Sequence, residues 1–259
     1  MTAYVREMYR YRSLIVALVG RHLSMRYRGS LLGFVWSFLN PLCLMLVYTL
    51  VFKFYIRFDD VENYTVFLFC GLLPWIWVTS AVTEGTGSIV GSGHLITKSM
   101  FPAQILPTVA VLTTLVNFLL SLPLLFLFMM GWGVPFHATL LGLPIVLGFQ
   151  GLFLLGVVLA LGALNVRYRD VQHLVGNALT FLFFLCPIIY PVTSVPEAFR
   201  FTLELNPLAL FTVVYHNLIL DGVLPTVNHV LYLGAWVGVV LWVGNAVFEG
   251  QREGFAEAL

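Results

Sequence analysis

The chain has 259 residues, of which 60% are hydrophobic and only 10% are charged. A soluble domain carries about a quarter charged residues, so this much apolar surface requires a lipid bilayer around it. The net charge of +1 says nothing about nucleic acid, and no cluster of Lys and Arg is long enough to argue for a nucleic-acid partner. We therefore expect an integral membrane protein.

Six segments are long and apolar enough to cross the hydrocarbon core, which takes about 20 residues. They cover residues 31–52, 64–82, 103–130, 138–163, 174–190 and 230–248. Between the last two, residues 208–220 form an apolar run that is too short to span, and we expect short re-entrant or interfacial helices there. The expected fold is all-α, with six transmembrane helices in one domain.

The positive charges predict which side of the membrane each end occupies. Ten of the 13 Lys and Arg residues fall in the N-terminal segment, the loops after the second and fourth spans, and the C-terminal tail. Because cytoplasmic loops are enriched in Lys and Arg, both termini are expected in the cytoplasm. The single domain, residues 1–259, then divides into a cytoplasmic segment (1–29), a six-span core (30–250) and a cytoplasmic tail (251–259).

The N-terminal segment has a helical pattern of its own. Its apolar residues recur at spacings of three and four, with arginines on the opposite face; the apolar set is Tyr4, Met8, Tyr11, Ile15 and Leu18. This pattern predicts an amphipathic helix lying in the membrane interface. The alternative is a cytosolic helix packed on another protein.

The predicted spans lack the groups that chemistry within a membrane requires. None of the six contains Asp, Glu, Lys or Arg, which argues against an ion-coupled carrier and an intramembrane enzyme. The six histidines have no metal-ligand spacing. Residues 91–99 resemble a phosphate-binding loop only faintly, because Thr97 stands where that motif needs glycine before the lysine. We expect no catalytic residue, metal or cofactor in this chain, and a pump would draw its power from another polypeptide.

Aromatic residues make up 15% of the chain. Core packing or lipid contact explains any single one of them. As a set they also suit a pathway for sugars, because aromatic rings stack on the apolar faces of pyranoses. The candidate channel residues are Trp36, Tyr48, Phe67, Trp75, Trp77 and Phe118.

Several strings resemble one family. The string RYRGSLLGFVW at residues 26–36, followed by NPL at 40–42, is similar to the entry of the first span in ABC-2-type transporter permeases. It most resembles those that export O-antigen, capsule or teichoic acid. Further strings agree in order and spacing at 71–75, 95–98, 101–102, 106–107, 165–170, 186–190 and 206–208. The strings RYRGSLLGFVWS and NYTVFLFCGLLPW are most similar to the O-antigen branch.

This resemblance implies the membrane subunit of an exporter in lipopolysaccharide biosynthesis. Such a permease is a homodimer in the bacterial inner membrane and binds two copies of a separate ATPase, which holds the ATP and Mg. The substrate is a polysaccharide attached to a polyprenyl diphosphate, and it passes between the two protomers. Alternatives are capsule or teichoic acid export, drug or small-amphiphile export, and a membrane scaffold or channel subunit without an ATPase.

The resemblance also assigns candidate site residues. The ATPase coupling loop would contain Ser88, His94, Leu95, Ile96, Lys98, Phe101 and Pro102. A second cytosolic contact would comprise Arg167, Tyr168, Arg169 and Asp170, although the last two could simply anchor a helix start. Arg26 and Arg28 could meet the lipid diphosphate, but positive-inside topology explains them equally well. Pro191, Asn206 and Pro207 would belong to a periplasmic gate.

Overall fold

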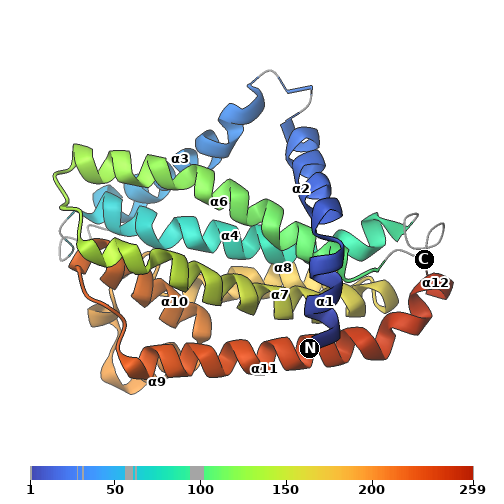
Figure 1. The fold of residues 1–259 in the computed structure, drawn as a ribbon. Coiled ribbons are helices and arrows are strands. Elements are labelled where there is room, and N and C mark those ends of the chain that lie inside the picture. Colours follow the sequence, from blue (N-terminus) through green and yellow to red (C-terminus); the bar gives the residue numbers. More distant parts are fainter. Residues whose placement is uncertain are drawn as a thin grey trace.

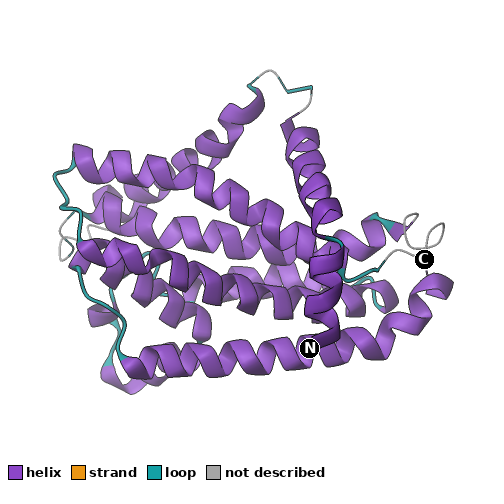
Figure 2. Ribbon diagram, viewed as in Figure 1, coloured by secondary structure: helices purple, strands orange, loops and turns teal. Residues whose placement is uncertain are grey.

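The structure is a computed structural model that describes residues 2–27, 29–30, 32–55, 61, 63–93 and 102–258. Within these ranges every regular element is a helix and no strand is present (Figure 2). The long helices α4, α6, α7 and α11 run side by side, and the N-terminal pair α1 and α2 crosses them (Figure 1). The all-α class predicted from the sequence is confirmed.

The helices follow one another with short connections. The α-helices are α1 (Thr2–Arg10), α2 (Arg12–Tyr27), α3 (Trp36–Thr49), α4 (Tyr64–Gly91), α6 (Ile105–Gly131), α7 (Leu143–Arg167), α8 (Val171–Phe184), α9 (Arg200–Leu205), α10 (Pro207–His216), α11 (Val227–Gln251) and α12 (Phe255–Ala258). Short 3₁₀ or π segments are η1 (Gly33–Val35), η2 (Leu50–Tyr55), η3 (Ala138–Gly142), η4 (Val192–Ser194), η5 (Glu197–Phe199), η6 (Asn217–Asp221) and η7 (Arg252–Gly254).

Among the described residues, five helical stretches are long and apolar enough to cross a membrane. They are Trp36–Tyr55, Tyr64–Gly91, Ile105–Gly131, Ala138–Arg167 and Val227–Gly254. A sixth apolar unit is bent by 99° between Glu197–Leu205 and Pro207–Asp221, as in a broken span or a re-entrant loop. The re-entrant piece expected at 208–220 therefore coincides with one arm of this bent pair.

The expected fifth span is shorter than predicted. Helix α8 has 14 residues and ends at Phe184, so it is only about 21 Å long, against about 30 Å for a hydrocarbon core. The chain turns at Cys186–Ile188 because Pro187 disfavours a helical conformation in the residue before it. Hydropathy continues through this turn, and the predicted boundary at residue 190 was therefore too late.

The predicted loop at 83–102 is also corrected, because α4 continues to Gly91. Glycines that suggest a loop serve instead as packing positions. A Cβ at Gly85 would lie 2.5 Å from Val158 Cγ1 of α7, and the Asn165 side chain donates to the Thr86 carbonyl at 3.1 Å. Helix α4 consequently contains one charged residue, Glu84, which the sequence placed outside the spans.

Helix α4 is the centre of the bundle. In its most apolar stretch 83% of the residues are buried, against 17% in the corresponding stretches of α3 and α11. Helices α3 and α11 therefore present most of their side chains outward, to lipid or to another protein.

A buried hydrogen-bond chain ties the bent pair to this centre. The Tyr215 hydroxyl donates to Gln150 Oε1 at 2.6 Å, and Gln150 Nε2 approaches the Pro74 carbonyl at 3.4 Å. It links α10, α7 and α4, and both side chains are almost fully buried. The chain thus fixes α10 against helices that are distant in sequence.

Replacing Tyr215 with phenylalanine is expected to lower the free energy of unfolding by about 1 to 3 kcal/mol, because Gln150 Oε1 loses its donor while staying buried. Thermal melting of the purified protein in detergent measures the change. The double variant Tyr215→Phe, Gln150→Leu should recover part of the loss. A double variant less stable than the sum of both single changes would contradict this reading.

Candidate functional site

The guanidinium of Arg26 is paired within the chain. Its Nη2 lies 2.6 Å from Glu84 Oε1, and the two side chains are 40% and 36% exposed. This pair joins the end of α2 to α4 across 58 positions of sequence. Arg28, the other residue assigned to a diphosphate, lies outside the described residues.

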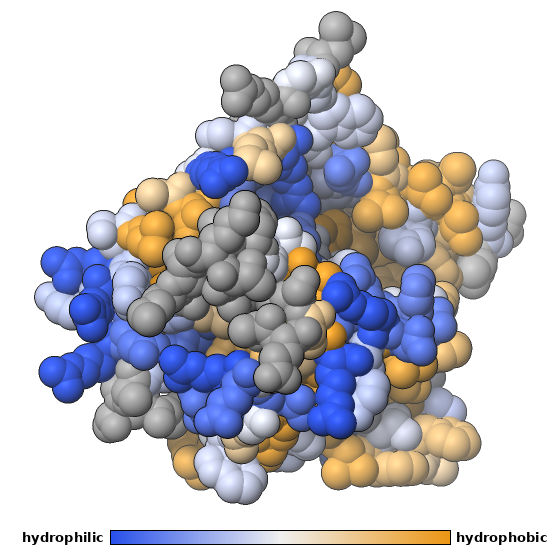
Figure 3. Space-filling view, turned by 90° about the vertical axis from the view of Figure 1, so that its right-hand side faces the viewer, coloured by the Kyte–Doolittle hydropathy of each residue, from blue (hydrophilic) through white to orange (hydrophobic). Residues whose placement is uncertain are grey.

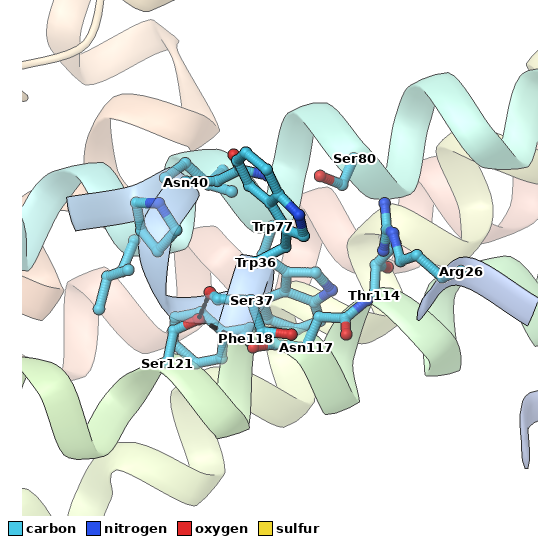
Figure 4. A pocket seen from close by; sticks show the side chains of 13 residues that line it. Arg26, Trp36, Ser37, Asn40, Trp77, Ser80, Thr114, Asn117, Phe118 and Ser121 are labelled. Carbon is cyan, nitrogen blue, oxygen red and sulfur yellow. Dashed lines mark hydrogen bonds between the residues drawn. The ribbon is translucent and has the colours of Figure 1, made fainter. Parts of the chain in front are cut away.

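A polar cavity of about 300 Å³ adjoins Arg26. Side chains from α2, α3, α4 and α6 converge on it (Figure 4). It brings together three of the six candidate aromatics, Trp36, Trp77 and Phe118, and the rings of the last two stack at 5.4 Å. Its neutral polar lining consists of Ser37, Asn40, Ser80, Thr114, Asn117 and Ser121. Most of these residues were not predicted from the sequence, since single hydroxyls and amides in apolar runs usually pair helices.

A separate aromatic groove of about 430 Å³ lies between α3, α4 and α8. It contains the candidates Tyr48 and Trp75, and both lie against Phe183, with ring centroids 5.6 and 5.8 Å away. Phe183 was not singled out from the sequence, where it is one phenylalanine among 22. Thr79, Thr83 and Thr180 add hydroxyls to the groove.

Phe67 belongs to neither of these sites. Its ring stacks on His216 at 4.1 Å, and the His216 Nε2 lies 3.1 Å from the Phe67 carbonyl. Phe67 and His216 line a third cavity of about 530 Å³ together with Pro191. The structure therefore places one candidate channel aromatic beside one candidate gate residue.

The other two gate candidates start α10. Asn206 Oδ1 accepts a hydrogen bond from the Leu208 amide at 3.0 Å, and its Nδ2 faces Cys186 Sγ at 3.5 Å. Pro207 occupies the first turn, where its missing N–H costs nothing. Together they set the bend of the α9–α10 pair.

Replacing Asn206 with alanine is expected to lower the free energy of unfolding by about 0.5 to 2 kcal/mol, because the helix cap is lost. Asn206→Ser, which keeps a capping oxygen, should lose less. Melting temperatures of the two variants in the same detergent compare their losses of stability. Equal losses would show that the cap is not what Asn206 contributes.

The residues assigned to the coupling loop divide into two groups. His94, Leu95, Ile96, Lys98 and Phe101 lie outside the described residues. Ser88 is helical, in α4, and its hydroxyl donates to the Gly85 carbonyl at 2.7 Å, so its expected place in a loop is wrong. Pro102 precedes α6, where its carbonyl accepts from the Ile105 amide at 3.0 Å. Residues 94–101 thus connect the end of α4 to the start of α6.

The second predicted contact, residues 167–170, is a tight exposed connection between α7 and α8. The Arg167 guanidinium lies 5.5 Å from the centre of the Tyr168 ring. Asp170 begins α8, but its carboxylate makes no capping hydrogen bond. Its side chain therefore does not anchor the start of α8 as a cap. The end of the bundle with this connection and the C-terminal helix is rich in hydrophilic residues (Figure 3).

The N-terminal helices dock on the start of α6. Ile15 is buried against Ile105 and Val109, and Met8, Tyr11 and Leu18 surround this contact. The predicted apolar face is confirmed, although its described contacts are within its own chain. Its position in the membrane interface stays a prediction.

Two polar contacts complete this docking. The Tyr4 hydroxyl lies 2.7 Å from Thr108 Oγ1, and Gln104 Nε2 donates to the Glu7 carboxylate. Burial raises the pKa of Tyr4 to about 12, so this phenol stays neutral near neutral pH. Helices α1 and α2 are thereby tied to the helix that follows residues 94–101.

These features define a multi-span α-helical membrane protein with a docked N-terminal helix pair, a polar cavity and an aromatic groove. The ABC-2 type transporter family matches residues 13–220, and the chain belongs to this family. It is accordingly a membrane-spanning transport component without an ATPase domain.

Named relatives extend over nearly the whole chain. It is 42% identical over 263 residues to the O-antigen export system permease protein RfbA of Myxococcus xanthus, with 100% of both chains covered. Identity to the RfbA of Klebsiella pneumoniae is 32% over 252 residues, or 95% of both chains. The polysialic acid transport protein KpsM of Escherichia coli is 24% identical over 244 residues, which cover 92% of this chain and 93% of KpsM.

Proposed function

We propose that this chain is the permease subunit of an exporter that moves a lipid-linked O-antigen polysaccharide across the bacterial inner membrane. The observation that carries this proposal is 42% identity, end to end, to an O-antigen export permease. The substrate is a polysaccharide on a polyprenyl diphosphate. Both termini face the cytoplasm, as the distribution of Lys and Arg predicts.

The permease acts as a homodimer with two copies of a separate ATPase, which binds the ATP and Mg. The outward-facing side chains of α3 and α11 support the dimer, because they leave a large apolar surface for a second copy. The coupling loop, which includes Leu95, Lys98 and Pro102, and the exposed connection at 167–170 are the contacts with the ATPase.

Coupling is mechanical. Closure of the ATPase dimer on ATP displaces residues 94–101, and this displacement reaches α4 and α6 directly. Helices α1 and α2 follow α6 because Ile15, Tyr4 and Glu7 bind its first turns. Translocation is thus gated by rigid helices and requires no chemistry inside the membrane.

The aromatic groove lines the polymer's path, with Tyr48, Trp75 and Phe183 as its stacking surfaces. Weak, repeated contacts suit a long polymer, which must be held and released many times. The cavity with Phe67, His216 and Pro191 supports a periplasmic gate at these residues.

A capsule polysaccharide is the second candidate substrate, because the KpsM relative is matched over 92% of this chain. Its lower identity, 24% against 42%, favours O-antigen. Teichoic acid and small amphiphiles are further substrates that a transport assay would separate. A scaffold or channel subunit predicts a protein that purifies alone and leaves ATP hydrolysis unchanged.

The test is co-expression with the ATPase encoded beside its gene, followed by purification through a tag on the permease alone. One ATPase per permease is expected, with hydrolysis altered by substitutions across residues 95–98. Arg169→Glu should weaken ATPase recovery, whereas the matched change Arg200→Glu, in the bent pair, should not. A permease that leaves the column alone, although both proteins are well expressed, would contradict the proposal.

A further inference from the structure

The polar cavity beside Arg26 has the lining of a carbohydrate site. The Trp36 side chain, which is 41% exposed, adjoins neutral hydroxyls and amides such as Ser80 and Asn40. Sugars need both, because a pyranose has an apolar face and hydroxyls that donate and accept hydrogen bonds. The lining combines apolar and polar side chains, and the described lining residues include no carboxylate to hold a cation.

The size of the cavity limits its occupant. Its volume of about 300 Å³ is at the lower end of small-molecule sites, which range from about 300 to 1,000 Å³. One sugar ring fits such a space, whereas a stretch of polymer does not. It is lined by helices of a single protomer and adjoins the groove at Tyr48 and Trp75 through Ile76, which lines both.

One wall of the cavity contains a buried donor without a partner. The Trp77 side chain is 1% exposed, and its indole N–H makes no hydrogen bond with any described residue. Leaving such a donor buried and unpaired costs about 1 to 3 kcal/mol. The Nε1 atom is itself buried, so a sugar hydroxyl would supply the acceptor once the indole turns its N–H into the cavity.

The Arg26–Glu84 pair stands at the rim of this cavity, since Arg26 itself is a lining residue. Both side chains are more than one-third exposed, and an exposed pair contributes only up to about 1 kcal/mol. An anionic group on the ligand can therefore displace Glu84 from Arg26 at small cost.

We propose that this cavity is a sugar-binding subsite, which holds one ring next to the diphosphate of the lipid-linked substrate while Arg26 exchanges Glu84 for that diphosphate. The choice of ligand rests on the proposed function. The site itself rests on the lining, the volume, the unpaired Trp77 donor and the ion pair at the rim. It selects the sugar end of the substrate within one protomer, before the polymer enters the groove.

Binding to the purified permease, without the ATPase and in a detergent that has no sugar headgroup, tests this proposal. The two probes are a prenyl diphosphate carrying one N-acetylglucosamine and the same prenyl diphosphate without sugar. Wild type should bind the glycosylated probe more tightly. Trp77→Phe keeps the ring but removes the donor, and should reduce this preference about 3- to 10-fold, the effect of one hydrogen bond. The matched control Trp242→Phe, at an exposed position on α11, should leave it unchanged.

Two further variants separate the parts of the site. Ser80→Phe fills the cavity, so it should abolish the preference for the sugar and spare binding of the bare diphosphate. Glu84→Gln frees Arg26 and should tighten binding of both probes up to about fivefold, whereas Arg26→Gln should weaken both. Melting temperatures confirm that each variant is folded.

A sugar preference that is absent in wild type, or that survives both Trp77→Phe and Ser80→Phe in folded protein, would overturn the subsite. A different result would contradict the proposed exporter function. In that case the wild-type chain would neither retain the ATPase nor alter its hydrolysis, whatever the two probes do.

Discussion

Gly244→Ala is expected to lower the free energy of unfolding by about 1 to 3 kcal/mol, the usual cost of overpacking a core. A Cβ at position 244, on α11, would fall on the Gly156 carbonyl oxygen of α7. A Cβ at Gly156 would in turn lie 2.7 Å from the Leu241 amide nitrogen. Because the atoms met are backbone, no side chain can rotate away, and the two helices must separate. Close approach through small residues is a usual way for helices to associate in membranes.

A matched substitution on the same helix serves as the control for this prediction. Gly238 has no atom within 4 Å of a hypothetical Cβ. Alanine is a better helix former than glycine by about 1 kcal/mol, so Gly238→Ala should be neutral or stabilising. Melting in detergent, followed by size-exclusion chromatography, compares the two. A Gly244→Ala protein as stable as Gly238→Ala would show that α7 and α11 are not in backbone contact.

Ile15→Asp is expected to detach α1 and α2 from the bundle and to uncouple ATP hydrolysis from transport. Ile15 is 6% exposed and packs on Ile105 and Val109. A buried, unpaired carboxylate there costs several kcal/mol, roughly 3 to 5, which exceeds what the surrounding contacts with α6 can offset. The arginines of the freed segment should then be cut rapidly by trypsin.

Ser13→Asp is the control, because it adds the same charge at an exposed position two residues away. It should leave both trypsin resistance and coupling near wild type. Limited proteolysis gives the first readout, and hydrolysis compared with transport in vesicles gives the second. Full coupling in an Ile15→Asp protein whose N-terminus is cleaved would contradict the proposed role of this helix pair.

The sequence predicts most spans because hydropathy and charge distribution are properties of local segments. It likewise predicts the apolar face of the N-terminal segment, since Met8, Tyr11 and Ile15 recur at helical spacing. It misplaces the end of α4, where Glu84 and several glycines resemble a loop; in the structure Glu84 pairs with Arg26 of α2, and Gly85 packs against Val158 of α7. It also overextends α8, because apolar character does not stop where the chain turns at Pro187.

The sites depend on contacts between distant segments, and these have no local signal. The six candidate aromatics share a composition, but the fold divides them among a polar cavity, a groove and the cavity near Pro191. Arg26 and Glu84 are 58 residues apart, and nothing in either neighbourhood indicates the other. The hydroxyls that make the cavity beside Arg26 polar become a set only when α3, α4 and α6 are assembled.

Transport in a defined membrane tests the central claim most directly. The permease and its ATPase are reconstituted in vesicles with a lipid-linked O-antigen polysaccharide, and an impermeant glycosidase reports which side the glycan occupies. The account predicts ATP-dependent movement of the glycan only when both proteins are present, and none with an ATPase that cannot hydrolyse ATP. Glycan that stays in place while the assembled complex hydrolyses ATP, or that crosses without the ATPase, would contradict it.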